Sequence, residues 1–220
     1  MRFYIKGELE RQIEFEQKFI ENSEVLIQKS HWDSTTDAIF DLSFDDHQER
    51  IEDYLNLDIP IFLSTVKTTL ATVYERCQGR NKDNIIGMNA IPGFINRSLW
   101  ELASINNFLP IAVKDLLENN NIEYKLIADR VGMVSPRILF MIINEAYYTV
   151  QEGTATKEDV DLGMKLGTNY PYGPFEWANK IGVKNIYQSL EAIYEDTKDE
   201  RYKICPLLKR EYQMRNQEII

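Results

Sequence analysis

Short apolar runs alternate with amphipathic stretches through the first 129 residues, and this alternation limits the fold more than any other feature. Between the first two runs, the segment ELERQIEFEQKFIE (8–21) repeats apolar residues at roughly helical spacing. Strands separated by helical segments of about 10 to 15 residues are typical of βαβ units in a parallel sheet. The predicted strands are residues 2–7, 24–30, 37–44, 59–66, 84–90 and 124–129. The sequence therefore predicts an α/β Rossmann-like domain with a mostly parallel sheet.

The segments that follow the later strands are also expected to be helical. One helix is predicted to begin near Thr68 or Thr69, a second to run from about Ile95 to Asn106, and a third to cover IAVKDLLENN (111–120).

After Asp129 the pattern changes to helices alone. Residues 135–153 are apolar on most sides, which predicts a central buried helix. Thr156, with Asp159 three residues later, predicts a helix start, and Gly167 a helix end. Pro174 suits the first turn of the next helix, which Gly182 is expected to close. Two domains follow: a Rossmann-like domain at 1–129 and an all-α domain at 130–220.

Charge and cysteine content narrow the class of protein. The formal net charge of -10 opposes binding to nucleic acid, because no concentrated basic patch offsets it. No apolar run approaches the roughly 20 residues that span a bilayer, and the N-terminus turns acidic too early for a signal peptide. Cys77 and Cys205 lie far apart with no histidine cluster, which predicts neither a disulfide framework nor a metal site. We expect a cytoplasmic protein with reduced thiols.

Two stretches of the helical region carry a resemblance to a known family. EGTATKEDVDLGMKLGTNYPYGPFEWANKIG (152–182) resembles the C-terminal helical domain of the 3-hydroxyacyl-CoA dehydrogenase family, which includes 3-hydroxybutyryl-CoA dehydrogenases, and residues 194–212 resemble its end. The likeness covers most of residues 137–212. It implies a Rossmann-like domain that binds NAD and a helical domain that dimerises and covers the acyl-CoA. The implied reaction is the oxidation of 3-hydroxyacyl-CoA in fatty-acid metabolism.

The resemblance also implies which positions perform the chemistry. The family uses a His–Glu pair in which the Glu follows the His by 12 residues. Here Glu101 occupies the Glu position and Asn89 the His position. Asparagine can hydrogen-bond a substrate oxygen, but it cannot relay a proton. The family's catalytic Ser falls on Lys67 or Thr68, and the position of its substrate-binding Asn holds Pro136.

The nucleotide fingerprint is degenerate in the same comparison. Dinucleotide binding uses G-x-G-x-x-G between the first strand and helix, because the pyrophosphate approaches the backbone closely there. Gly7 holds the first position, but Leu9 and Gln12 fill the other two. Glu8 and Glu10 add negative charge where the phosphates would lie. NAD is implied by the resemblance alone, and its binding in the usual mode is not expected.

Three interpretations stay open at this point. The chain is a dehydrogenase with an atypical, weakly active site; or it is a non-catalytic dimer that binds an acyl-CoA, another small ligand or a partner protein; or it has a new activity that uses Glu101 and Lys67. The dimer follows from the resemblance. Four apolar residues of one helix either support it or form an intramolecular core: Phe140, Met141, Tyr147 and Tyr148.

Overall fold

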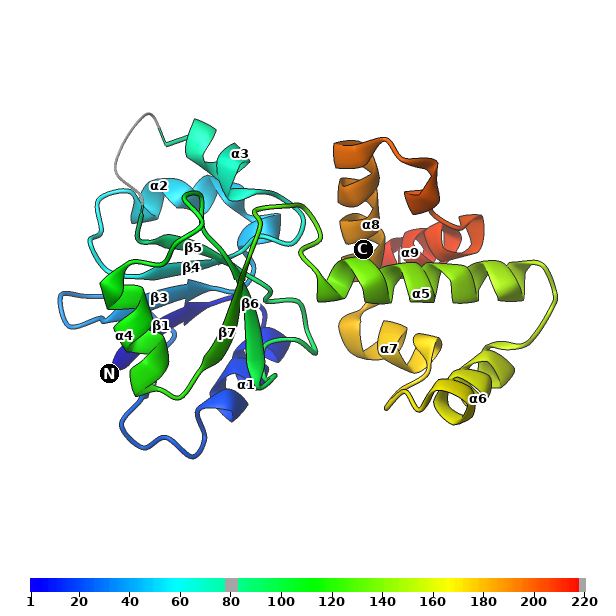
Figure 1. Cartoon of the computed structure of the whole chain (residues 1–220), viewed down its shortest axis with the longest axis horizontal. Coiled ribbons are helices and arrows are strands. Elements are labelled where there is room, and N and C mark those ends of the chain that lie inside the picture. The colour runs from blue at the N-terminus through cyan, green and yellow to red at the C-terminus, as the bar shows by residue number, and fades with distance from the viewer. Residues whose placement is uncertain (78–82, 218–220) are drawn as a thin grey trace. The chain divides into compact units, whose positions relative to one another are not determined.

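The computed structural model describes residues 1–77 and 83–217, and these form two compact units that meet in sequence at Met133 and Val134. The first unit contains all the strands that the structure describes, and the second is helical (Figure 1). The predicted fold class, a Rossmann-like domain followed by an all-α domain, is confirmed.

A single sheet organises the described part of the first unit. Its strand order is β2-β1-β3-β4-β5-β6-β7, and every neighbouring pair is parallel except β5 and β6. The usual dinucleotide-binding sheet has two strands beyond its first strand, in the order 3-2-1-4-5-6, whereas here β2 alone lies beyond β1. The strands are β1 (Arg2–Lys6), β2 (Leu26–Gln28), β3 (Ala38–Asp41), β4 (Ile61–Ser64), β5 (Ile85–Met88), β6 (Leu99–Ala103) and β7 (Glu123–Ile127).

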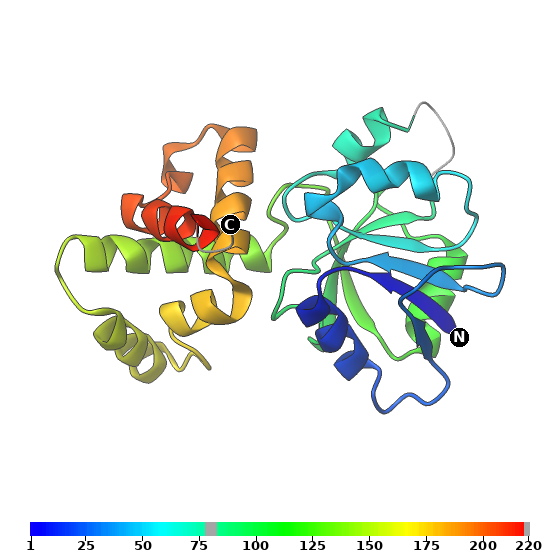
Figure 2. The ribbon, with the colours of Figure 1, turned by 180° about the vertical axis from the view of Figure 1, so that it is seen from behind.

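Helices cover both faces of this sheet (Figures 1 and 2). On one face α1 and α4 bury an aromatic-rich core in which Phe40 and Phe62 stack at 4.6 Å between ring centroids. On the other face α2 and α3 pack around Tyr54 and Leu70. The helices are α1 (Leu9–Lys18), α2 (Ile51–Tyr54), α3 (Leu70–Glu75) and α4 (Ile111–Asn119), with short 3-10 turns at Phe44–Asp46 and Gln48–Arg50.

The helix predicted from Ile95 to Asn106 is wrong. Residues 91–98 form turns, and Leu99–Ala103 form β6, which pairs antiparallel with β5. Trp100 and Leu102 alternate along β6 and enter the aromatic core, a period of two that a strand produces and a helix does not. The sequence prediction failed because the return to a neighbouring strand goes through a long loop without a helix.

The helical spacing predicted in residues 8–21 is confirmed in part. Phe15 and Phe19 are buried, whereas Leu9, Ile13 and Ile20 are exposed, at 68%, 44% and 79%. The buried positions are Arg11, Phe15 and Phe19, spaced four residues apart. A charged side chain therefore occupies the inner face of the first turn of α1.

The second unit is built around one long helix. α5 (Ser135–Gln151) packs against α7, α8 and α9, and its Phe140 and Tyr147 are buried within the unit. Asn144 of α5 donates to the carbonyl of Lys203 and accepts from the backbone of Cys205, both at 2.9 Å, which fixes the chain before the last helix. The other helices are α6 (Lys157–Thr168), α7 (Pro174–Ile181), α8 (Val183–Thr197) and α9 (Pro206–Gln217), with a 3-10 turn at Glu200–Tyr202.

Most predicted helix ends in this unit are confirmed. Thr156 and Asp159 form a capping box at the start of α6, Pro174 begins α7, and Gly182 ends it with φ +86°. The predicted end of α6 at Gly167 is wrong, because Asn169 takes the left-handed conformation that terminates the helix.

Gly173 is the position in this unit where a side chain is least tolerable. The Asp161 carboxylate accepts hydrogen bonds from the backbone of Phe175 at 2.7 Å and Glu176 at 3.1 Å, at the start of α7. A Cβ on Gly173 would lie 2.5 Å from the Asp161 backbone and closer still to its carboxylate. The glycine therefore permits the contact between α6 and α7.

We expect Gly173→Ala to destabilise the second unit by about 1–3 kcal/mol, because the added methyl overpacks against Asp161. Urea unfolding followed by Trp177 fluorescence measures this. Gly163→Ala is the matched control: its Cβ would meet nothing within 4 Å, and alanine is the better helix former by about 1 kcal/mol. Equal stability of the two variants would contradict the packing argument.

Candidate functional site

The carboxyl edge of the parallel strands brings together most of the residues that the sequence singled out. Gly7 follows β1, Thr68 follows β4 and Asn89 follows β5. The chain leaves β1 to one side for β2 and returns on the other side as β3, so the strand order reverses between β1 and β3. Ligands of open α/β sheets bind at such a reversal. This edge is therefore the candidate site, and we describe it from β1 outwards.

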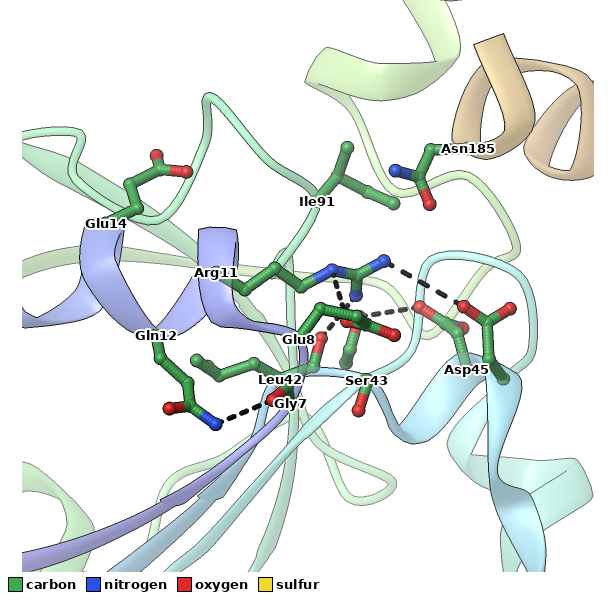
Figure 3. Close-up of polar contacts among 12 residues, drawn as sticks. Gly7, Glu8, Arg11, Gln12, Glu14, Leu42, Ser43, Asp45, Ile91 and Asn185 are labelled. Carbon is green, nitrogen blue, oxygen red and sulfur yellow. Dashed lines mark hydrogen bonds and ion pairs between the residues drawn. The ribbon is translucent and has the colours of Figure 1, made fainter. Parts of the chain in front are cut away.

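The turn between β1 and α1 is filled by side chains of the protein itself (Figure 3). Gln12 donates from Nε2 to the Gly7 carbonyl at 2.6 Å. Gly7 has φ +155°, and a Cβ there would lie 3.1 Å from Leu42 Cβ, so packing against the end of β3 accounts for this glycine. Glu8 occupies the N-cap position of α1 without capping it through its side chain.

Arg11 is the central residue of this turn, and sequence reasoning missed it. Its guanidinium, 3% exposed, donates to the Leu42 carbonyl and pairs with Glu8 at 3.1 Å. A further nitrogen lies 3.9 Å from Asp46 Oδ2. The side chain thus joins α1 to the segment that follows β3.

The charged contacts continue from Arg11 towards β4. Lys67 Nζ binds Asp46 at 2.7 Å, and Asp45 accepts from Ser64 Oγ at 2.6 Å. Asp45 also accepts from the backbone N–H groups of Val66 at 3.0 Å and Lys67 at 2.7 Å. We call Glu8, Arg11, Asp45, Asp46 and Lys67 the crevice network.

Burial governs the electrostatics of this network. It raises the pKa of Asp45, against the opposing effects of Lys67 and the Ser64 hydrogen bond. Burial likewise lowers the pKa of Lys67, against the effects of Asp45 and Asp46. Each charge has its compensating partner within the network, so the arrangement holds the loop after β4 in place. Lys67, a candidate for a new activity, already binds Asp46 and interacts electrostatically with Asp45.

Asn89 and Glu101 lie side by side across the β5–β6 pair. The Asn89 backbone N–H donates to the Glu101 carbonyl at 3.2 Å, and the two residues are 5% and 8% exposed. Asn89 Oδ1 accepts from the Ile91 N–H at 3.4 Å. The Glu101 carboxylate acts on Arg97: burial lowers the pKa of Arg97, and Glu101 and Glu14 oppose that shift.

The segment after β4 and Asp129 meet at the start of α3. Thr68 is buried beside Thr69, whose side chain caps α3 by accepting from Thr72 N–H at 3.1 Å. Asp129 accepts from the N–H groups of Leu70 and Ala71 at 2.8 and 2.9 Å, also at the start of α3.

The position of the family's substrate-binding Asn lies in the second unit. Pro136 lies in the first turn of α5, and Arg137 donates to the Tyr202 hydroxyl at 2.9 Å.

Two negative findings apply to the described residues. They include no group of three or more His, Cys, Asp or Glu side chains that could hold a metal ion. No helix described here is both long and apolar enough to cross a membrane.

The fold defines the class of protein: an α/β unit with a Rossmann-like sheet, followed by a helical unit. Residues 132–217 match the family described as "3-hydroxyacyl-CoA dehydrogenase, C-terminal domain". The 3-hydroxyadipyl-CoA dehydrogenase of Escherichia coli is 44% identical over 84 residues, which cover 38% of this chain and 18% of that protein. The 3-hydroxybutyryl-CoA dehydrogenase of Clostridioides difficile is 27% identical over 196 residues, which cover 82% of this chain and 70% of that protein.

The fold is shared with solved structures as well. The crystal structure of (S)-3-hydroxybutyryl-CoA dehydrogenase from Ralstonia eutropha superposes with a TM-score of 0.70 at 20% identity, covering 95% of this chain and 92% of that one. The helical unit is thus similar to the C-terminal domain of the 3-hydroxyacyl-CoA dehydrogenase family. The match to the family model lies in the helical unit, and the α/β unit carries the departures described above.

Proposed function

We propose that this chain is a family member whose NAD-dependent oxidation of 3-hydroxyacyl-CoA is weak or absent. The observation that carries the proposal is Arg11, buried in the turn where a dinucleotide needs an open glycine backbone. The chemistry of the family supplies the expectation of activity, and the residues of this site argue against it.

The residues at this turn do not fit NAD in the usual mode. Gln12 and Leu9 replace two glycines, and the Gln12 amide already binds the Gly7 carbonyl. The crevice network contains three carboxylates and two cations, so its formal charge is -1 before any phosphate arrives. A diphosphate would meet net negative charge and occupied donors, and both oppose its binding.

The proton transfer has also lost its base. Oxidation of a hydroxyl group requires a side chain that accepts the proton, and an asparagine at position 89 accepts none near neutral pH. Glu101 is buried at 8% exposure, and its carboxylate opposes the lowering of the pKa of Arg97 by burial. Asn89 and Thr68 retain the capacity to hydrogen-bond a ligand oxygen.

We expect Asn89→His to leave turnover of acetoacetyl-CoA with NADH at the background rate. The substitution restores a base worth about 10²- to 10⁴-fold, but the nucleotide has no place to bind. A spectrophotometric assay at 340 nm with saturating acetoacetyl-CoA checks this, with Asn119→His, at an exposed position of α4, as the control substitution. A large gain in turnover for Asn89→His alone would contradict the proposal, since it would mean that NADH binds.

The second candidate function is a non-catalytic dimer that binds an acyl-CoA, another small ligand or a partner protein. Phe140 and Tyr147 give no support to the dimer, because both are buried within the unit. Leu162 and Leu166 do favour it: they lie one turn apart on α6 and are 54% and 78% exposed. Light scattering after size-exclusion chromatography tests the dimer. A monomer at all concentrations would contradict it.

A further inference from the structure

The loop between β5 and β6, residues 89–98, connects Asn89 to the strand that holds Glu101, and its conformation is set from α1. Glu14 accepts three backbone hydrogen bonds from this loop, from Gly93 at 2.8 Å, Ile95 at 2.9 Å and Asn96 at 3.0 Å. One carboxylate thus satisfies three N–H donors about 80 residues away in sequence. We call residues 89–98 the site loop.

Lys18, one turn further along α1, provides a positively charged donor to the same loop. Its Nζ donates to the Arg97 carbonyl at 2.7 Å. Within the loop, Arg97 Nε donates to the Gly93 carbonyl at 3.1 Å, and the guanidinium lies 4.0 Å from the centre of the Phe94 ring. α1 therefore accepts hydrogen bonds from the loop through the Glu14 carboxylate and donates one to it through the Lys18 ammonium group.

The same helix would carry the phosphate-binding turn in a dinucleotide-binding sheet. In this chain Arg11 ties its first turn to the end of β3, and Glu14 ties its next turn to the site loop. Charge-assisted hydrogen bonds are the strong ones, and three on one carboxylate orient a loop well. α1 thus orders the edge of the sheet by its own side chains.

We propose that Glu14 is a positioning residue: it holds the site loop so that the Asn89 amide can bind the thioester oxygen of an acyl-CoA. The inference rests on the proposed function, in which Asn89 binds a ligand oxygen and transfers no proton. The three hydrogen bonds to Glu14 come from the backbone of the chain itself, so α1 sets the conformation of the site loop.

The test uses Glu14→Ala in the full chain, with Glu10→Ala, an exposed carboxylate on the same helix, as the matched control. The first readout is the side-chain amide signal of Asn89 in the ¹H–¹⁵N spectrum, assigned by its loss in Asn89→Asp. The second is the affinity for acetoacetyl-CoA by calorimetry. Glu14→Ala should shift or broaden the Asn89 signal and weaken binding by about tenfold or more, since it removes hydrogen bonds to a charged group. Glu10→Ala should change neither.

Acetate separates positioning from a general packing role. Added acetate should restore the Asn89 signal and the affinity of Glu14→Ala, because it returns a carboxylate to the three N–H groups, whereas neutral acetamide should not. If Glu14→Ala does not fold, Glu14→Gln keeps the volume and should still disturb the Asn89 signal, because its NH₂ opposes the loop donors. An unchanged Asn89 signal, or equal rescue by acetamide, would overturn the inference. If the wild-type chain does not bind acetoacetyl-CoA, acyl-CoA binding fails, and the Asn89 signal still decides the role of Glu14.

Discussion

Arg11→Ala is expected to lower the free energy of unfolding of the first unit by about 3 kcal/mol, towards the lower end of what breaking a buried ion pair costs. The substitution leaves the Leu42 carbonyl without its guanidinium donor and Asp46 with less positive charge nearby. The loss of stability stays moderate because Lys67 still binds Asp46, and because the half-exposed Glu8 side chain can turn to solvent. The measurement is urea unfolding by fluorescence in a Trp177→Phe background, where Trp32 and Trp100 report on the first unit.

Two further variants show whether the network is the cause. Arg11→Lys keeps the charge but loses the planar fork, so its stability should fall between wild type and alanine. Glu10→Ala, on the same helix and exposed, should stay within about 0.5 kcal/mol of wild type. If Arg11→Ala changed the free energy of unfolding as little as Glu10→Ala, the crevice network would not stabilise the fold.

Trp100→Ala is expected to cost about 3–5 kcal/mol, the range for removing a large aromatic side chain from a core. Trp100 lies in β6 and contacts four phenylalanine rings, with centroid distances of 6.0 to 6.5 Å. Its indole N–H also donates to the Ile95 carbonyl of the site loop at 2.8 Å. Urea unfolding followed by circular dichroism at 222 nm gives the free energy.

Trp100→Phe separates packing from the hydrogen bond. It keeps a ring in the core and loses the donor, so a loss of about 1–3 kcal/mol is expected. Trp32→Phe, on the opposite face of the sheet, is the control for tryptophan replacement as such. A cost for Trp100→Ala below about 1 kcal/mol would contradict the placement of β6 in the core.

The alternation of apolar runs and helical segments predicted the fold class because it follows from local periodicity. β6 was not predicted because Leu99–Ala103 pairs with β5 across a long loop, and that pairing is not visible in the local sequence pattern. The inward orientation of Arg11 on α1 could not be predicted for a similar reason. Leu9 and Ile13 fit a helical stripe, but the burial of Arg11 depends on acceptors 31 and 35 residues away, at Leu42 and Asp46.

The candidate site also contains residues that the sequence identified and residues that it did not. Gly7, Thr68, Asn89 and Glu101 were identified from sequence, the last three through the family resemblance. Glu8 and Lys67 were also singled out, but the contacts that join them in the crevice network and the contacts of Glu14 were not, because they connect segments distant in sequence. One signal was available: SFDD (43–46) places two carboxylates just after a predicted strand, at the edge where ligands bind.

Whether the turn between β1 and α1 can hold a dinucleotide is decided by a calorimetric titration of the wild-type protein with NADH. We expect no saturable heat, because the crevice network occupies the turn at which the pyrophosphate would bind. A dissociation constant in the micromolar range would contradict it, and would mean that Arg11 and Gln12 leave the turn when the nucleotide arrives.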